Sequence, residues 1–357
     1  MPSGRFEQQP RGQAAGLFAK SFTRDGGTAS PLCGLREPIL HFRRSRALAF
    51  MTVIRTFLFA FALGLAAGAQ AASTVRLPNW ACNASNDRIF RSGLQANEWV
   101  PRAPSLGSGG AYPGVQVRTL NLPLGSGTQK IHLYIPPGYN PAYATPLVVT
   151  LHGTAGSPAN ADVYAQDVRN AWQSVAVTRG FIVAAPVANG PNGSWVSGAV
   201  GGNNDYTFLA AVMADLRSAY NIDGARTQLW GFSAGGHVAH DLLVNGPVSA
   251  YDENHLAAYA VSAGRLFSLA CSGDSEAQCQ NLLDTQARKL PLYIVLGAND
   301  PMTLPPLNAI DDPPRFESAG WVTDDTLGFY LHGGGHEYDA GHFVLVWNLF
   351  CRFALSP

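Results

Sequence analysis

From residue 146 onward, short apolar runs alternate with segments of helical periodicity, and this alternation constrains the fold more than any other feature. The run 146–151 is almost continuously apolar, as expected for a strand that is buried on both faces of a parallel sheet. Further strands are predicted at 181–186, 227–230, 257–262, 291–297 and 327–331, with helices near 161–178, 206–220 and 342–354 and one beginning at Ser233. Two antiparallel strands, 115–120 and 130–135, precede this region. The order predicts an α/β protein in which helices cover both faces of a mostly parallel central sheet.

Residues 51–71 have the layout of a secretory signal peptide. Arg55 precedes an apolar run over 56–67, and the small residues of Ala69-Gln70-Ala71 match the pattern that signal peptidase cleaves. The run is short for a membrane span, so a membrane anchor is the less favoured alternative. We therefore predict a secreted or periplasmic protein without a stable membrane anchor.

Residues 1–50 fit poorly in front of such a signal, because Arg, Ser, Gly and Gln dominate them without amphipathic periodicity. We interpret 1–50 as a probable non-native extension, with translation starting at Met51. A single long signal that uses Arg43 and Arg44 is the weaker alternative.

The remaining residues are predicted to comprise an irregular N-terminal arm, 72–112, and a catalytic domain, 113–357. Removing 1–71 takes away nine of the 24 Lys and Arg and three of the 24 Asp and Glu, which leaves 15 basic and 21 acidic residues and a net charge of −6. Because Lys130 and Lys289 are the remaining lysines and no basic cluster is present, nucleic acid is not an expected partner.

Four of the five cysteines remain after position 71, an even number in a chain that carries an export signal. Disulfides are expected in that setting. We favour Cys271–Cys279, which closes a short polar loop, and by elimination Cys82–Cys351, which ties the arm to the last helix. Four free thiols are the alternative, and zinc is disfavoured because no CxxC pair occurs.

The segment Gly231-Phe232-Ser233-Ala234-Gly235 lies between a predicted strand and a predicted helix. This is the context of a nucleophile elbow, in which a sharp turn holds a serine in a strained conformation at the helix N-terminus. The flanking glycines avoid collisions with neighbouring chain. An ordinary tight turn is the alternative, since the motif is common by chance.

A second signal follows the strand 146–151, which ends in His152-Gly153-Thr154. Acyl transfer needs two N–H donors directed at the oxyanion. In hydrolases of this architecture one comes from the residue after the nucleophile, here Ala234, and the other from the loop after an earlier strand, here Thr154. The sequence therefore predicts an oxyanion hole formed by Thr154 and Ala234.

The acid and the base of a triad should follow the serine in the order Ser, Asp, His. Asp300 follows the carboxyl end of the predicted strand 291–297, and His336 lies on the glycine-rich loop after the strand 327–331. Competing acids are Asp311 and Asp312, which resemble solvated turn residues. Competing bases are His332 and His342, which belong to the strand and to the final helix.

Metal binding is not predicted. His237 and His240, or His332 and His336, have a spacing that a metal pair can use, but no third ligand stands at a suitable spacing. We interpret His237 and His240 as buried, hydrogen-bonded structural histidines, and we predict no cofactor.

With these residues in place, the sequence resembles the secreted α/β-hydrolases grouped with polyhydroxybutyrate depolymerases and with feruloyl and acetylxylan esterases. The segments that carry the resemblance are 146–154, 205–216, 231–236, 296–300 and 333–336. The resemblance implies the α/β-hydrolase fold and esterase activity, and it supports Ser233, Asp300 and His336 as the triad. It does not specify the substrate.

Two departures from the family's pattern affect the predicted substrate. Polymer-degrading members often carry a linker and a binding module after the catalytic domain, whereas 21 residues follow His336 here, which makes crystalline polyester a less favoured substrate. The usual Trp-Pro after the base is replaced by Glu337-Tyr338. Trp195, Tyr206 and Tyr338 are candidate substrate contacts, as is Trp321, although aromatic residues are more commonly part of the core.

We therefore predict a secreted serine carboxylic-ester hydrolase that forms an acyl-enzyme. The expected substrates are aryl (feruloyl-type) esters, short-chain acyl esters or hydroxyalkanoate oligomers, all of them small-molecule or oligomeric esters. The alternatives are a polyhydroxybutyrate depolymerase proper, a serine peptidase of the prolyl-oligopeptidase type, and an inactive hydrolase-fold binding protein.

Overall fold

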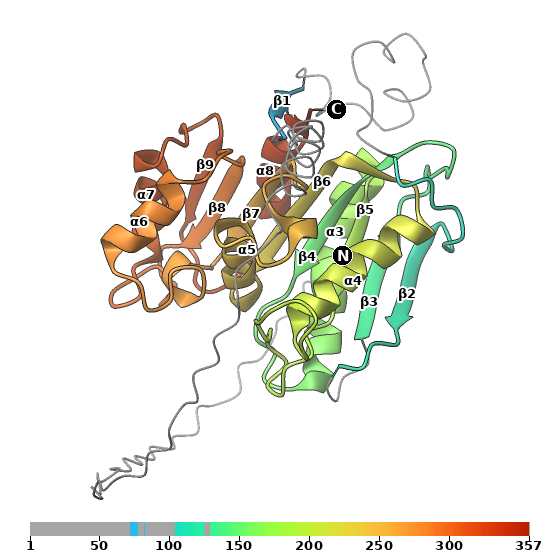
Figure 1. Cartoon of the computed structure of the whole chain (residues 1–357), viewed down its shortest axis with the longest axis horizontal. Coiled ribbons are helices and arrows are strands. Elements are labelled where there is room, and N and C mark those ends of the chain that lie inside the picture. The colour runs from blue at the N-terminus through green and yellow to red at the C-terminus, as the bar shows by residue number, and fades with distance from the viewer. Residues whose placement is uncertain (1–71, 78–81, 83–103, 125–128, 357) are drawn as a thin grey trace, which may run out of the picture. The chain divides into compact units, whose positions relative to one another are not determined.

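An eight-stranded sheet, antiparallel at one edge and otherwise parallel, forms the centre of the fold (Figure 1). The computed structural model describes residues 72–77, 82, 104–124 and 129–356, which all lie in the unit 69–357. The strand order across the sheet is β2-β3-β5-β4-β6-β7-β8-β9. The strands are β2 (Gly114–Leu120), β3 (Gln129–Ile135), β4 (Thr145–Leu151), β5 (Ile182–Pro186), β6 (Ile222–Phe232), β7 (Ala258–Ser262), β8 (Leu292–Gly297) and β9 (Leu327–His332).

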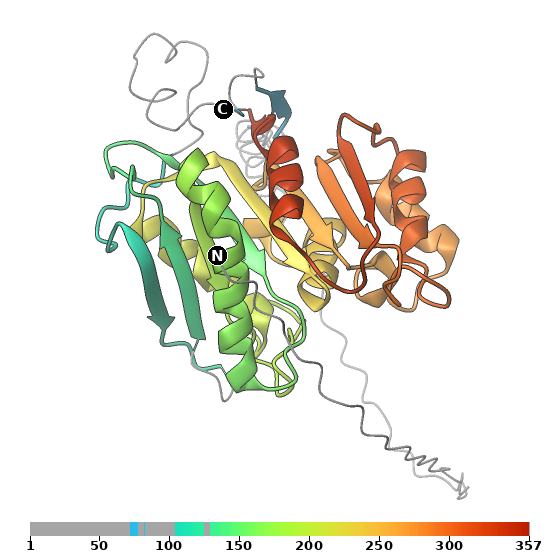
Figure 2. The same ribbon diagram turned by 180° about the vertical axis from the view of Figure 1, so that it is seen from behind.

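Helices cover both faces of the sheet, and each face has its own apolar core. Figures 1 and 2 show α4 and α5 on one face and α3 and α8 on the other. On the face of α3 and α8, the ring of Trp172 packs against that of Phe343, with centroids 5.0 Å apart. The helices are α3 (Pro158–Arg179), α4 (Asp205–Ala219), α5 (Ala234–Val244), α6 (Glu276–Asp284), α7 (Asp312–Ser318) and α8 (Ala340–Phe350). The predicted arrangement of a mostly parallel sheet between two helical layers is confirmed.

Two elements differ clearly from their predicted bounds, and two helices were not predicted. β6 is longer than predicted because its first residues include a buried ion pair, Arg226 Nε to Asp223 Oδ2 at 2.6 Å, which masks the apolar pattern of a strand. The final helix ends at Phe350 and not at 354, because the next residues form the strand β10 (Phe353–Leu355). The short helices α6 and α7 were not predicted, although the Ser275 capping box at the start of α6 is visible in the sequence.

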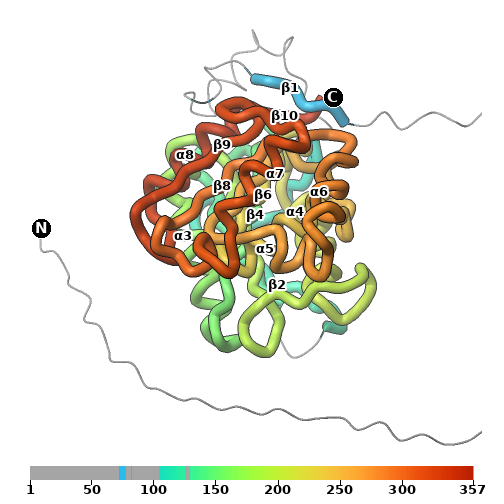
Figure 3. The backbone as a smooth tube through the Cα atoms, turned by 90° about the vertical axis from the view of Figure 1, so that its left-hand side faces the viewer, coloured from blue at the N-terminus to red at the C-terminus, as the bar shows by residue number. Residues whose placement is uncertain are grey.

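The segment predicted as an irregular arm contributes one short strand, β1 (Thr74–Arg76), which pairs antiparallel with β10 near the C-terminus (Figure 3). A disulfide joins Cys82 to Cys351, the residue that follows α8, and confirms the predicted tie between the arm and the last helix. The predictions for 1–50 and 51–71 concern residues outside the described part of the chain. Within the described part, no helix combines the length and the apolar character that crossing a membrane requires.

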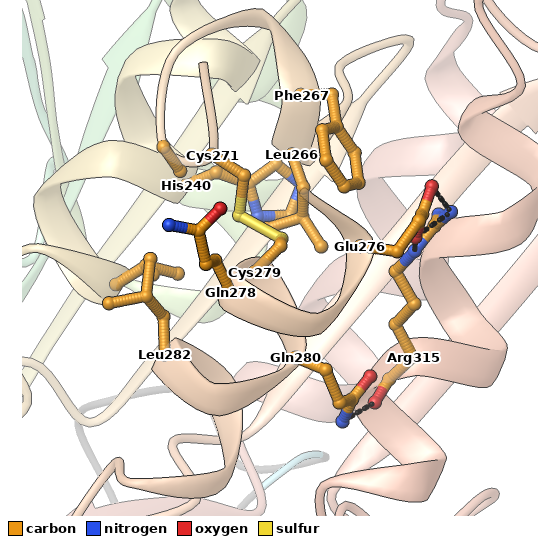
Figure 4. Close-up of a disulfide and its surroundings, with 12 residues drawn as sticks. His240, Leu266, Phe267, Cys271, Glu276, Gln278, Cys279, Gln280, Leu282 and Arg315 are labelled. Carbon is orange, nitrogen blue, oxygen red and sulfur yellow. Dashed lines mark hydrogen bonds and ion pairs between the residues drawn. A yellow bond between two sulfur atoms is a disulfide. The ribbon is translucent and has the colours of Figure 1, made fainter. Parts of the chain in front are cut away.

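The second predicted disulfide, Cys271–Cys279, is also present and lies on the opposite helical layer. Figure 4 shows it next to His240 and Leu266, with both sulfur-bearing residues fully buried. At the start of α6, two bonds of 2.9 Å join Glu276 to the guanidinium of Arg315 on α7. The bridge and the ion pair together hold α6 against the rest of this layer.

Removing the Cys82–Cys351 bridge should destabilise the protein more than removing Cys271–Cys279. The first bond joins residues 269 positions apart and the second residues 8 apart, and a cross-link that closes a longer loop restricts the unfolded chain more strongly. We expect the double variant Cys82→Ala/Cys351→Ala to lose about 2–5 kcal/mol of unfolding free energy. Urea titrations of both double variants would measure this, and equal losses would contradict the role of loop length.

Candidate active site

Ser233 occupies a strained turn between β6 and α5, as the sequence predicts. Its φ of 53° lies in the left-handed region that residues with a side chain rarely adopt. The turn is held on both sides, because Ser233 N–H donates to Ser262 O at 2.9 Å and His237 N–H donates to Ser233 O at 3.0 Å. A Cβ at Gly231 would lie 2.2 Å from the carbonyl oxygen of Gly235, so only glycine fits there.

The loop after β4 lies directly against this turn. A Cβ at Gly153 would be 3.1 Å from the Cβ of Ser233, and a Cβ at Gly235 would be 2.3 Å from the carbonyl oxygen of Leu151. Thr154 is exposed next to this contact, and Ala234 is the first residue of α5. The two predicted oxyanion donors therefore belong to segments that meet at Ser233, and the N-terminus of α5 favours negative charge there.

Asp300 and His336 are brought to Ser233 from the two neighbouring strands at the edge of the sheet. His336 Nε2 lies 2.8 Å from Ser233 Oγ, and His336 Nδ1 lies 2.8 Å from Asp300 Oδ2. The side chain of Asp300 is 1% exposed and that of His336 is 37% exposed. The imidazole thus bridges a buried carboxylate and a hydroxyl that faces solvent.

Backbone hydrogen bonds join the loop that carries Asp300 to the loop that carries His336. Asn299 donates from its backbone N–H to Gly334 O at 2.9 Å and from its side chain to Gly333 O at 2.8 Å. Asp300 Oδ1 accepts the N–H of Met302 at 2.7 Å, which orients the carboxylate. The glycine run is therefore fixed relative to Asp300 along its length.

The competing histidines lie beneath this loop rather than at the serine. His332 ends β9, and its Nδ1 accepts the N–H of Gly334 at 3.1 Å. Its ring lies 4.5 Å from that of His342, which caps the first turn of α8 together with Asp339. Both histidines support the loop, whereas His336 is the one that contacts Ser233.

Asp312 is not the solvated turn residue that the sequence suggested. It is 2% exposed, accepts the N–H of Leu266 at 2.9 Å and pairs with Arg315 at 3.1 Å. Burial raises the pKa of this carboxyl to about 7. Asp312 is the first residue of α7, followed by the Pro pair, and its carboxyl connects that helix to the turn after β7. Its carboxylate is fully used in this structural role.

His237 and His240 are on the nucleophile helix and do not join the triad. Burial lowers the pKa of His240 to about 3, and its Nδ1 lies 3.4 Å from the hydroxyl of Tyr259. For His237, burial lowers the pKa to about 4, with further contributions from Arg265 and His336. Its Nε2 is buried without a hydrogen-bond partner among the described residues, contrary to the predicted hydrogen-bonded role. At neutral pH His237 therefore adds no positive charge beside His336.

Two of the four candidate substrate-contacting aromatics are excluded by burial. Tyr206 is 2% exposed and its hydroxyl donates to Asp241, while Trp321 is 5% exposed and donates to Leu290 O. Both belong to the apolar core, where a buried Tyr hydroxyl or Trp N–H usually finds a hydrogen-bond partner. Trp195 is half-buried, and its indole N–H already donates to His152 O at 2.7 Å.

Tyr338 does lie beside the triad. Its ring packs on Phe232, with centroids 4.8 Å apart, and Phe232 lies 5.0 Å from the ring of His336. Burial raises the pKa of the Tyr338 hydroxyl to about 12, so it remains protonated. The exposed Tyr164 on α3, 42% accessible, is close enough to Tyr338 to influence that pKa. Sequence reasoning missed Tyr164, since no motif marks one exposed residue in a helix.

Among the described residues, no group of three or more His, Cys, Asp or Glu side chains is arranged to hold a metal ion. The chemistry available at this edge of the sheet is that of a hydroxyl, an imidazole and a carboxylate in line. This arrangement suits nucleophilic attack assisted by a general base.

Comparison with known proteins places the chain in a family. The sequence model of the family described as esterase PHB depolymerase matches residues 130–311, which is just over half of the chain. The chain belongs to this family. The match runs from Lys130 in β3 to Asp311, directly before α7, and includes Ser233 and Asp300.

Two similar proteins extend this finding. The bifunctional acetylxylan esterase/xylanase XynS20E of Neocallimastix patriciarum is 28% identical over 171 residues, which cover 48% of this chain and 21% of that protein, so the match spans about a fifth of that relative. A solved structure of a ferulic acid esterase is 15% identical, with a TM-score of 0.51 over 67% of this chain and 97% of that chain. This likeness shows the α/β-hydrolase fold. The family to which the chain belongs is thus one of esterases, and its fold is that of the α/β-hydrolases.

Proposed function

We propose that this esterase-type hydrolase is a secreted serine esterase in which Ser233, Asp300 and His336 form the catalytic triad. The observation that carries the proposal is the continuous line from Asp300 Oδ2 through both nitrogens of His336 to Ser233 Oγ, with each separation 2.8 Å. The strained backbone of Ser233 adds support, because strain of this kind is found at nucleophile elbows.

In the proposed reaction, His336 Nε2 accepts the Ser233 proton as Oγ attacks the ester carbonyl carbon. Asp300 holds the proton on Nδ1 and stabilises the imidazolium. The N–H groups of Thr154 and Ala234 bind the negative oxygen of the tetrahedral intermediate. Its collapse breaks the bond to the alcohol, which takes the proton from His336, and leaves the acyl group on Ser233. Water activated by His336 then releases the acid and regenerates Ser233.

The proposed substrates are aryl esters, short-chain acyl esters and hydroxyalkanoate oligomers. Tyr338 and Phe232 form an apolar surface beside His336, against which we expect an aromatic or small acyl group to pack. The names of the two similar proteins, an acetylxylan esterase and a ferulic acid esterase, fit the same classes. We assign Tyr338 to substrate contact on this basis.

Export is part of the proposal. Two disulfides lie within the described residues, and such bonds persist in oxidising compartments. The sequence pattern of a signal peptide at 51–71 is consistent with this location.

Labelling with a fluorophosphonate would test the proposal, because this reagent modifies activated serines. We expect the purified protein to gain one adduct, located at Ser233 by peptide mass spectrometry. The same preparation would be assayed on p-nitrophenyl acetate and butyrate, methyl ferulate, acetylated xylan, hydroxybutyrate oligomers and a peptide p-nitroanilide. Cleavage of the anilide in preference to every ester would favour a peptidase, and no adduct with no turnover would favour an inactive binding protein.

A further inference from the structure

Hydrogen bonds join the long loop 187–204 to three residues of the segment that follows β4. Trp195 Nε1–H donates to the carbonyl oxygen of His152 at 2.7 Å. Thr154 Oγ1 donates to Ser194 Oγ at 3.0 Å, and Ala155 N–H donates to Gly193 O at 3.1 Å. Three consecutive residues of one loop thus hold the segment that contains Thr154.

The side chain of His152 also joins the loop after β4 to the loop 187–204. Burial lowers its pKa to about 4, so the imidazole is neutral at neutral pH. Nε2 accepts the N–H of Ala188 at 3.1 Å, which places the ring proton on Nδ1, where it donates to Gly153 O at 2.6 Å. The indole of Trp195 lies against this ring, with centroids 5.1 Å apart.

A buried carboxylate folds the long loop into this position. Asp205, the first residue of α4, is fully buried and accepts hydrogen bonds from the start and from the middle of the loop. Its Oδ1 accepts the backbone N–H of Asn189 at 3.1 Å and its side-chain amide at 2.7 Å. Its Oδ2 accepts the N–H of Val196, the residue after Trp195, at 2.7 Å. The carboxylate therefore determines where Trp195 can lie.

The segment held in this way has little freedom to move at the nucleophile. A Cβ at Gly153 would already be 3.1 Å from Ser233 Cβ, so a displacement of the loop changes the distance between Thr154 and Ser233 directly. Misplacing a catalytic group by about 1 Å can cost about 100-fold in rate.

We propose that Trp195 and Asp205 are positioning residues for the oxyanion-binding loop, which they hold through the His152 carbonyl and the fold of the loop 187–204. The inference rests on the proposed function, since it assigns Thr154 N–H to the oxyanion. It also replaces the predicted role of Trp195 as a substrate contact, because its N–H is already bonded to protein.

Trp195→Phe is the main test, because it keeps an aromatic ring and removes the N–H. Trp321→Phe is the matched control, since Trp321 also donates its indole N–H to a backbone carbonyl at 2.7 Å but packs against Phe316, away from Ser233. We expect Trp195→Phe to lower kcat on p-nitrophenyl acetate by about 10- to 100-fold with KM nearly unchanged. The control should keep the wild-type kcat.

A second readout separates oxyanion binding from general loosening of the fold. Each enzyme would be assayed on a p-nitrophenyl ester and on the matching thionoester, whose sulfur is a weaker hydrogen-bond acceptor and gains less from the oxyanion hole. We expect the preference for the oxygen ester to fall in Trp195→Phe and in Asp205→Asn, with Ser233 still labelled by fluorophosphonate. Trp321→Phe should keep the wild-type preference.

Either of two results for Trp195→Phe would overturn the inference. A kcat within twofold of wild type with an unchanged oxygen preference would show that the bond to His152 does not position the loop. A raised KM with unchanged kcat would return Trp195 to substrate binding. A wild-type protein without esterase activity would instead refute the proposed function.

Discussion

Replacing Ser233 with alanine should abolish ester hydrolysis, lowering kcat on p-nitrophenyl butyrate by about 10⁴-fold or more. The reason is that Oγ is the atom 2.8 Å from the imidazole of His336, and alanine leaves that base without a nucleophile to activate. Initial rates measured at high enzyme concentration would determine the residual turnover.

The protein should remain folded in this variant. The side chain of Ser233 is partly exposed, and the turn is held by backbone hydrogen bonds that alanine retains. Ser318→Ala, on the exposed surface of α7, is the control and should keep wild-type turnover. Residual activity above a few per cent in Ser233→Ala, with an unchanged thermal melt, would show that the nucleophile lies elsewhere.

The strand ends were predictable from the sequence because the fold itself places functional groups there. In a parallel sheet with helical crossovers, the carboxyl ends of the strands meet along one edge. Ser233, Asp300 and Gly153 each follow an apolar run, so their approximate meeting point follows from local pattern alone. The separations of 2.8 Å between His336 and its two partners do not follow from local pattern. They depend on hydrogen bonds such as those of Asn299 to the glycine run.

Burial of single polar and aromatic residues could not be predicted in the same way. Asp312 and Tyr206 stand in segments whose sequence looks exposed or functional, yet both are buried by contacts with other elements, Asp312 with Leu266 and Tyr206 with Asp241. The hydrogen bonds that Asp205 makes to the loop could not be predicted from the sequence either. A carboxylate at a helix start is usually explained by its interaction with the helix dipole. Only the fold of the loop 187–204 shows that it bonds to Asn189 and Val196.

Comparing His336→Ala with His332→Ala should identify the base. His336 contacts both Ser233 and Asp300, so its loss should lower kcat by about 10⁴-fold or more. His332 contacts the backbone of Gly334 and the ring of His342, and its loss removes one hydrogen bond that supports the loop. We expect a fall of no more than about tenfold for His332→Ala, equivalent to one ordinary hydrogen bond.

Only three glycines separate the two histidines, because His332 ends β9 and His336 lies on the glycine-rich loop that follows, so the comparison is demanding. If general loosening of this loop were the cause of inactivity, both variants would lose activity and thermal stability together. If His336 acts as the base, its variant should lose turnover and fluorophosphonate labelling while the melting temperature hardly changes, because its side chain is 37% exposed and its ring packs on the partly exposed Phe232. The reverse ranking would assign the base to His332 and would require the loop to move before Ser233 reacts.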